Sequence, residues 1–190
     1  MISTATTWKP SLTGGPDLEM GSGTNFVAQL SGGGRQSIGE ANAVARQVED
    51  SPSLATQLWE AITFPDPVVS MRAVDELEKV SVTNAEVLRG HEQEVLESLA
   101  CSDLPEVRWH VGLLIPRLRL DRRQLTRAAA VLDRLLDDPG RIVQANALTG
   151  TVLLADEHPD LVERADRALS RTSRSPHASV RARARRLTAS

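Results

Sequence analysis

Six arginines in the C-terminal half of the chain form two sets with helical spacing. The sets are Arg123, Arg127 and Arg134, and Arg164, Arg167 and Arg171. Residues three, four, seven or eleven positions apart lie on one side of a helix, so each set forms a stripe. A guanidinium group pairs with a carboxylate or a phosphate through two parallel hydrogen bonds. The stripes therefore predict a cationic surface that binds an acidic segment of a partner protein.

The same arginines also fit a second interpretation, in which they are ordinary surface residues. Acidic residues four positions away offer them partners on the same helix or just beyond its end. These pairs are Asp160 with Arg164, Glu163 with Arg167, and Arg134 with Asp138. Exposed pairs of this kind contribute about 0.2–0.5 kcal/mol each. Spacing alone does not decide between a binding surface and solvated ion pairs, and both interpretations stay open.

Other catalytic or metal-binding chemistry has little support in the sequence. His91 and Glu92 form one His-Glu pair, whereas a metal site needs several convergent ligands. Cys101 is the single cysteine, which excludes an intrachain disulfide or a Cys-based zinc site, and we interpret it as a structural thiol. The glycines at 14–15 and 32–34 lack the Lys-Ser/Thr of a phosphate-binding loop. We expect no catalytic residue, no metal and no cofactor.

Charge is distributed unevenly, although the net charge is only -3. Residues 40–106 contain fourteen acidic and four basic residues, and residues 107–190 contain nine acidic and sixteen basic residues. An acidic partner would approach the C-terminal half, and head-to-tail pairing of two copies is a further possibility. No segment resembles a signal peptide or a membrane span, so we expect a cytoplasmic protein. The oligomeric state is not predictable from these features.

The elements that position the arginines follow from a phrase that the chain repeats four times. A valine stands downstream of a proline and is followed four positions later by alanine or valine. The valines are Val69, Val107, Val143 and Val180, at intervals of 38, 36 and 37 residues. A fixed period of this length indicates a stack of helical hairpins, each of which buries its apolar face against its neighbours.

This period predicts an all-α fold, namely a short right-handed α-solenoid of antiparallel helix pairs with a flexible N-terminal tail. The glycine-rich segment 1–36 is expected to be disordered or loosely docked, and 37–190 to form the solenoid. Within it we expect a capping helix pair at 37–64, repeats at 66–102, 103–137 and 138–173, and a capping helix at 175–190. Asp-Pro or Ser-Pro pairs are expected to start the helices, and Pro116 to kink or end one.

The repeated helix is expected to be amphipathic. The second and fourth positions after each valine are mostly apolar, whereas the first and third positions are polar. The third position is occupied by Arg72, His110, Asn146 and Arg183. In the last helix we expect Arg181, Arg183, Arg185 and Arg186 to face solvent.

The phrase resembles the HEAT repeat, in which Asp-Pro opens a helix and Val-Arg is followed by alanine. The matching residues are Asp66-Pro67 with Val69 and Ala73, Pro105 with Val107-Arg108, Asp138-Pro139 with Val143 and Ala147, and Val180-Arg181 with Ala184. The chain also resembles small bacterial HEAT-repeat proteins of unassigned role. The resemblance implies a non-enzymatic protein-interaction scaffold whose second helices line a concave surface, here rich in arginine. It also implies an alternative, a nucleic-acid-binding or DNA-repair protein of the HEAT-like glycosylase type, in which Trp59 and Trp109 would handle DNA. We favour a packing role for Trp109.

Overall fold

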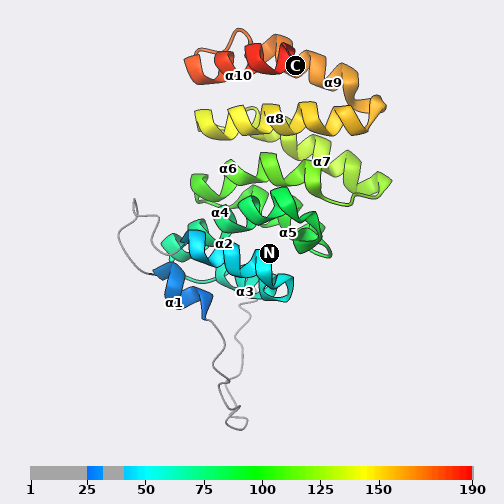
Figure 1. Cartoon of the computed structure of the whole chain (residues 1–190). Coiled ribbons are helices and arrows are strands. Elements are labelled where there is room, and N and C mark those ends of the chain that lie inside the picture. Colours follow the sequence, from blue (N-terminus) through cyan, green and yellow to red (C-terminus); the bar gives the residue numbers. More distant parts are fainter. Residues whose placement is uncertain (1–24, 32–40, 190) are drawn as a thin grey trace, which may run out of the picture.

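The protein is described by a computed structural model that covers residues 25–31 and 41–189, and these residues form helices and turns without a strand (Figure 1). Successive helices stack along one direction, with α1 at one end and α10 at the other. The prediction of an all-α solenoid of antiparallel helix pairs is confirmed. Most of the predicted tail, residues 1–24 and 32–36, lies outside the described residues.

The α-helices are α1 (Phe26–Ser31), α2 (Ala41–Asp50), α3 (Ala55–Ile62), α4 (Pro67–Thr83), α5 (Glu92–Glu97), α6 (Pro105–Leu114), α7 (Arg122–Leu135), α8 (Arg141–Glu157), α9 (Val162–Thr172) and α10 (Ala178–Thr188). Short 3-10 helices at Pro52–Leu54, Ala85–Leu88, Leu99–Cys101, Ile115–Arg117 and Pro159–Leu161 connect or extend them. Pro116 lies in one of these, and α6 ends two residues before it, as expected from the missing proline N–H.

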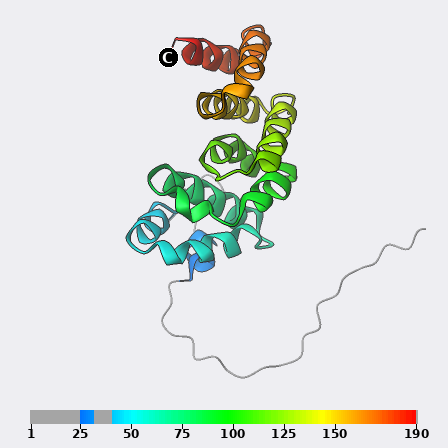
Figure 2. The same cartoon turned by 90° about the vertical axis from the view of Figure 1, so that its right-hand side faces the viewer.

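The repeats form two layers (Figure 2). The first layer consists of the helices that carry the valine phrase, α4, α6, α8 and α10, and each packs on the next. The second layer consists of α5, α7 and α9. The four valines of the phrase are 0–1% exposed, so all of them are buried, and Val69, Val107 and Val143 belong to one hydrophobic core. Their burial confirms that the period in the sequence is a packing period.

The two layers are not equally tight. In the first layer, α6 and α8 approach so closely that a β-carbon on Gly112 would lie 2.6 Å from the backbone nitrogen of Ala147. In the second layer, α7 and α9 make few contacts, and pockets open between successive helices. The closest approach between helices therefore lies in the first layer, and the second layer is more open. That the second helices line a concave surface, as the resemblance implies, stays a prediction.

The start of the helices differs in part from the prediction. Asp66 caps α4, and its side chain accepts a hydrogen bond from the Val68 N–H at 2.8 Å, with Pro67 in the first turn. Asp138 instead accepts from Gly140 N–H at 2.7 Å, and Ser175 from His177 N–H at 3.2 Å. These side chains close turns ahead of the helix, so α8 and α10 begin two residues after their prolines.

The polar third position after each valine does not simply face solvent. Arg72 is 4% exposed, and its Nη1 donates to the carbonyl of Leu30 at 2.5 Å. Asn146 Nδ2 donates to the carbonyl of Trp109 at 2.8 Å, and Arg183 Nη1 donates to Thr149 Oγ1 at 2.5 Å. Each of these side chains reaches back to a preceding helix. Arg183 was expected to face solvent and instead joins α10 to α8.

The N-terminal end of the described stack is closed by α1, which lies within the segment predicted as a tail. Phe26 and Leu30 of this short helix are 1% and 0% exposed. They pack against the helix pair α2–α3 and against α4. This docking agrees with the apolar character of residues 26–30 and supplies the carbonyl that Arg72 binds.

Candidate functional site

The six predicted arginines lie on the second layer. Arg123, Arg127 and Arg134 belong to α7, and Arg164, Arg167 and Arg171 belong to α9. We call the exposed side of α5, α7 and α9, with the residues that flank their ends, the second-helix face. The start of α7 is defined by a capping box: Asp121 accepts from Gln124 N–H at 2.8 Å, and Gln124 Oε1 accepts from Asp121 N–H at 2.9 Å.

Three of these arginines pair with an acid on the preceding second helix or just after its end. Arg127 Nη1 lies 3.0 Å from Glu97 Oε1 of α5. Arg164 pairs with Asp133 of α7. Arg171 Nη1 lies 3.0 Å from Oδ1 of Asp137, directly after α7. These ion pairs join successive repeats, and they were not predicted because their partners are 30 to 34 positions apart in the sequence.

The three pairs share one geometry that matters for binding. In Arg127, Arg164 and Arg171, the contact to the neighbouring acid uses Nη1 alone. The Nε–H and Nη2–H groups form the other edge of the guanidinium plane and make no hydrogen bond with any described residue. An edge of this kind accepts a carboxylate through two parallel hydrogen bonds. The neighbouring acid thus orients each guanidinium and leaves its binding edge open.

The remaining three arginines differ from one another. Arg134 donates from Nη2 to the carbonyl of Ala100 at 3.1 Å and from Nη1 to Cys101 Sγ at 3.1 Å. Arg167 lies 3.5 Å from Glu163 on its own helix. Arg123 has no hydrogen bond or ion pair within the described part of the chain. Of the three pairs at a spacing of four residues that the sequence offers, the structure contains the one between Glu163 and Arg167.

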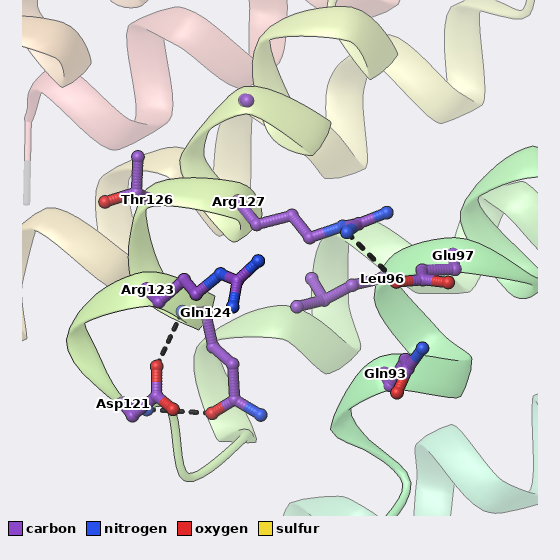
Figure 3. Close-up of a pocket in the computed structure, with 9 residues that line it drawn as sticks. Gln93, Leu96, Glu97, Asp121, Arg123, Gln124, Thr126 and Arg127 are labelled. Atoms are coloured by element: carbon purple, nitrogen blue, oxygen red, sulfur yellow. Dashed lines mark hydrogen bonds and ion pairs between the residues drawn. The ribbon is translucent and has the colours of Figure 1, made fainter.

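All six arginines line pockets between successive repeats. A pocket with a volume of about 690 Å³ lies between α5 and α7 (Figure 3). Its lining residues are Gln93, Leu96, Glu97, Asp121, Arg123, Gln124, Thr126, Arg127 and Ala130. A pocket of about 450 Å³ lies one repeat further, between α7 and α9, and includes Arg164, Arg167 and Arg171. A third, of about 430 Å³, includes Arg134 and Cys101.

A second charged cluster lies in the first layer, between α4 and α6. Lys79 Nζ lies 2.8 Å from Asp75 and 2.6 Å from Glu76, whose side chain is fully buried. Burial raises the pKa of Glu76, and Lys79 opposes this shift. Burial lowers the pKa of His110, and the charge of Asp75, 3.8 Å away, compensates for this only in part. This cluster joins neighbouring helices and opens into none of the pockets on the second-helix face.

Trp59 and Trp109 both pack against other residues. Trp59 is 5% exposed, its Nε1–H donates to the carbonyl of Val87 at 2.9 Å, and its ring stacks on His91 with centroids 3.9 Å apart. Trp109 packs against the core and is partly exposed. Trp59 is therefore not available to stack on a base in this conformation.

Cys101 is exposed rather than enclosed in the core, in contrast to the expectation of a structural thiol. Among the described residues, no group of three His, Cys, Asp or Glu side chains is arranged to hold a metal ion. No helix in the described ranges has both the length and the apolar character needed to cross a membrane.

The stacked pairs and their repeat spacing define an α-solenoid of the HEAT/armadillo type. Searches of family models and of curated proteins give no match. Among solved structures, the chain is similar to one from the complex of CpcE and CpcF of phycocyanin lyase from Nostoc sp. PCC7120. The TM-score is 0.67 at 18% identity, over 86% of this chain and 95% of that one.

Two designed proteins have the same architecture. One is a designed armadillo repeat protein in complex with the peptide (KR)4, with a TM-score of 0.62 at 16% identity over 86% of this chain and 79% of that one. The other is an armadillo repeat protein that was computationally designed for modular peptide recognition. Its TM-score is 0.56 at 18% identity, over 86% of this chain and 71% of that one. At these identities the likeness concerns the fold.

Proposed function

We propose that this protein is a non-enzymatic interaction scaffold that binds an acidic segment of a partner protein on the second-helix face. The observation that carries the proposal is the shared geometry of Arg127, Arg164 and Arg171. Each guanidinium is held by an acid of the preceding repeat and keeps its Nε/Nη2 edge free. Because these groups are oriented before binding, less side-chain entropy is lost when a carboxylate arrives.

The fold supports a peptide ligand of this kind. Two similar structures are designed for, or bound to, peptides, and in one of them the peptide is (KR)4, which is basic. The second-helix face of this chain presents arginines, so the complementary peptide is acidic. Exposure also agrees with binding, since the side chains of Arg127 and Arg171 are 56% and 51% exposed.

The alternative of a nucleic-acid-binding protein has weaker support. Glu97, Asp133 and Asp137 alternate with the arginines on the same face. These carboxylates interrupt the positive charge of the face, and a nucleic acid, which carries a charge at every phosphate, meets more of them than a short acidic segment does. Strong retention of the protein on immobilised duplex DNA at low salt would favour this alternative over the proposal.

The proposal is tested with a double variant in which Arg127→Gln and Arg171→Gln are combined. The probe is a fluorescent peptide of alternating Asp and Ser residues, titrated with the protein at about 50 mM and about 500 mM NaCl. We expect the double variant to bind about tenfold more weakly at the lower salt concentration. Wild-type binding should also weaken strongly with salt.

The matched control combines Arg141→Gln and Arg185→Gln. These two arginines are exposed on α8 and α10 of the first layer, and the change in net charge is the same. If both double variants lose affinity equally, the arginines act through net charge alone. The assignment to the second-helix face is then wrong.

A further inference from the structure

The pocket between α5 and α7 differs from the one between α7 and α9 in its lining. Most of its exposed surface consists of carbon atoms, and Leu96 and Ala130 contribute apolar groups to its wall. Leu96 points from α5 toward α7 and lies between the labelled side chains of both helices (Figure 3). In the pocket between α7 and α9, polar and apolar surface are nearly balanced, and Asp133 and Asp137 lie opposite the arginines.

The rim of the α5–α7 pocket is polar and carries charges of both signs: Arg123 and Arg127, with Glu97 and Asp121, whose side chain already accepts from Gln124 N–H. Arg123 and Arg127 extend along it from α7, and the first of them is unpaired within the described ranges (Figure 3). Gln93 approaches from α5 and also makes no hydrogen bond with a described residue. Glu97 is already occupied by Arg127 at 3.0 Å. An occupant of this pocket therefore meets carbon at the wall and free guanidinium donors at the edge.

We propose that the partner segment places one large apolar side chain in the pocket between α5 and α7, next to a carboxylate that pairs with Arg123. This inference rests on the proposed function and adds the chemistry of the recognised segment, an apolar residue flanked by acids. The volume of about 690 Å³ lies in the range of about 300–1,000 Å³ for ligand pockets in proteins.

The remaining acids of the segment meet the next pair of oriented arginines. Arg164 and Arg171 line the pocket one repeat further, between α7 and α9. A second carboxylate that pairs there completes the recognition of a segment that crosses from α7 to α9.

The test compares two synthetic peptides of about ten residues, long enough to cross both pockets at about 3.3 Å per residue. Both alternate Asp and Ser, and one carries Leu in place of a central Ser. We expect the Leu peptide to bind the wild-type protein about tenfold more tightly, because the leucine side chain leaves water. The protein variant is Ala130→Leu, which fills the pocket from an exposed helix position without changing charge.

In Ala130→Leu, the affinity for the Leu peptide falls to that for the Ser peptide, so the preference disappears. The control is Ala178→Leu, an equal change at an exposed position of α10, which keeps the preference. Equal affinity of the two peptides for the wild-type protein overturns the apolar anchor but leaves the arginine surface intact. Absence of binding by both peptides overturns the proposed function together with the anchor.

Discussion

Gly150 of α8 faces Gly112 of α6 so closely that a β-carbon on Gly150 would overlap the carbonyl oxygen of Gly112. A β-carbon on Gly112 would in turn lie 2.6 Å from backbone atoms of Asn146 and Ala147. The backbones of the two helices are thus in direct contact. This contact leaves no room for a side chain between α6 and α8 at these two positions.

Replacement Gly150→Ala is expected to destabilise the protein by about 2 kcal/mol. Overpacking costs about 1–3 kcal/mol, and here the obstructing atom is a backbone carbonyl that cannot rotate away. The better helix propensity of alanine, about 1 kcal/mol, offsets part of this cost. The measurement is the free energy of unfolding in urea.

The control for this prediction is Gly140→Ala. A β-carbon there meets side-chain atoms of Asp138 and Val143 at 3.0 and 3.2 Å, and these are able to move. We expect a loss below about 1 kcal/mol. Equal losses in the two variants would show that the α6–α8 backbone contact does not require glycine.

The sequence was sufficient to predict the stack but not the close approach of α6 and α8. The valine period and the apolar positions around it specify which side of each helix is buried, and the structure agrees at all four valines. That approach involves Gly112 and Gly150, which belong to different repeats and become neighbours only after packing.

The candidate site was predictable to a similar extent. Helical spacing placed the six arginines on one face, and they do line pockets there. Their partners were not predictable, because Asp133 and Asp137 are about one repeat away from Arg164 and Arg171. The sequence also suggested that Arg72 and Asn146 face solvent, because they are polar. The carbonyl groups that they bind belong to other helices, which the sequence does not reveal.

Stability is expected to depend on pH through His110. Its pKa is lowered from 6.5 by burial, with Asp75, Glu78 and Lys79 as the charged groups around it. The unfolded state therefore binds the proton more readily than the folded state. The contribution of His110 to stability is present above pH 6.5 and is lost as the pH falls below that value toward the lower pKa of the folded state.

The measurement compares unfolding free energies of wild type and His110→Gln between about pH 7.5 and about pH 5.5. Glutamine does not titrate, so the wild type should lose more stability than the variant on acidification. Glu76 is present in both proteins. Its raised pKa stabilises the folded state on acidification in both, which is opposite to the effect of His110. Parallel curves for the two proteins would mean that His110 titrates alike in the folded and unfolded states.

Trp59 is expected to serve stability rather than binding. Trp59→Phe removes the hydrogen bond to the carbonyl of Val87 and shortens the ring that stacks on His91. We expect a destabilisation of about 2 kcal/mol in urea unfolding, with unchanged affinity for the acidic peptide. Trp109→Phe is the control. Because Trp109 is partly exposed, its replacement should lower the free energy of unfolding by less. A loss of peptide or DNA binding by a folded Trp59→Phe variant would contradict this assignment.

Removal of the negative charge of Asp133 is expected to strengthen binding of the acidic peptide. Asp133 pairs with Arg164 through Nη1, and its side chain is 48% exposed, so its charge also faces an incoming carboxylate. In Asp133→Asn the repulsion is removed, while the amide oxygen still accepts a hydrogen bond from Arg164. We expect the affinity to rise about threefold at low salt, corresponding to about 0.7 kcal/mol.

The accompanying change in stability should be below about 1 kcal/mol, because a partly exposed ion pair contributes little to folding. Asp156→Asn, an equal change of charge at an exposed position near the end of α8, is the control and should leave affinity nearly unchanged. If Asp133→Asn instead weakens peptide binding, then the negatively charged carboxylate of Asp133 is needed to orient Arg164 for the peptide. An equal gain in both variants would mean that the peptide responds to net charge and not to this face.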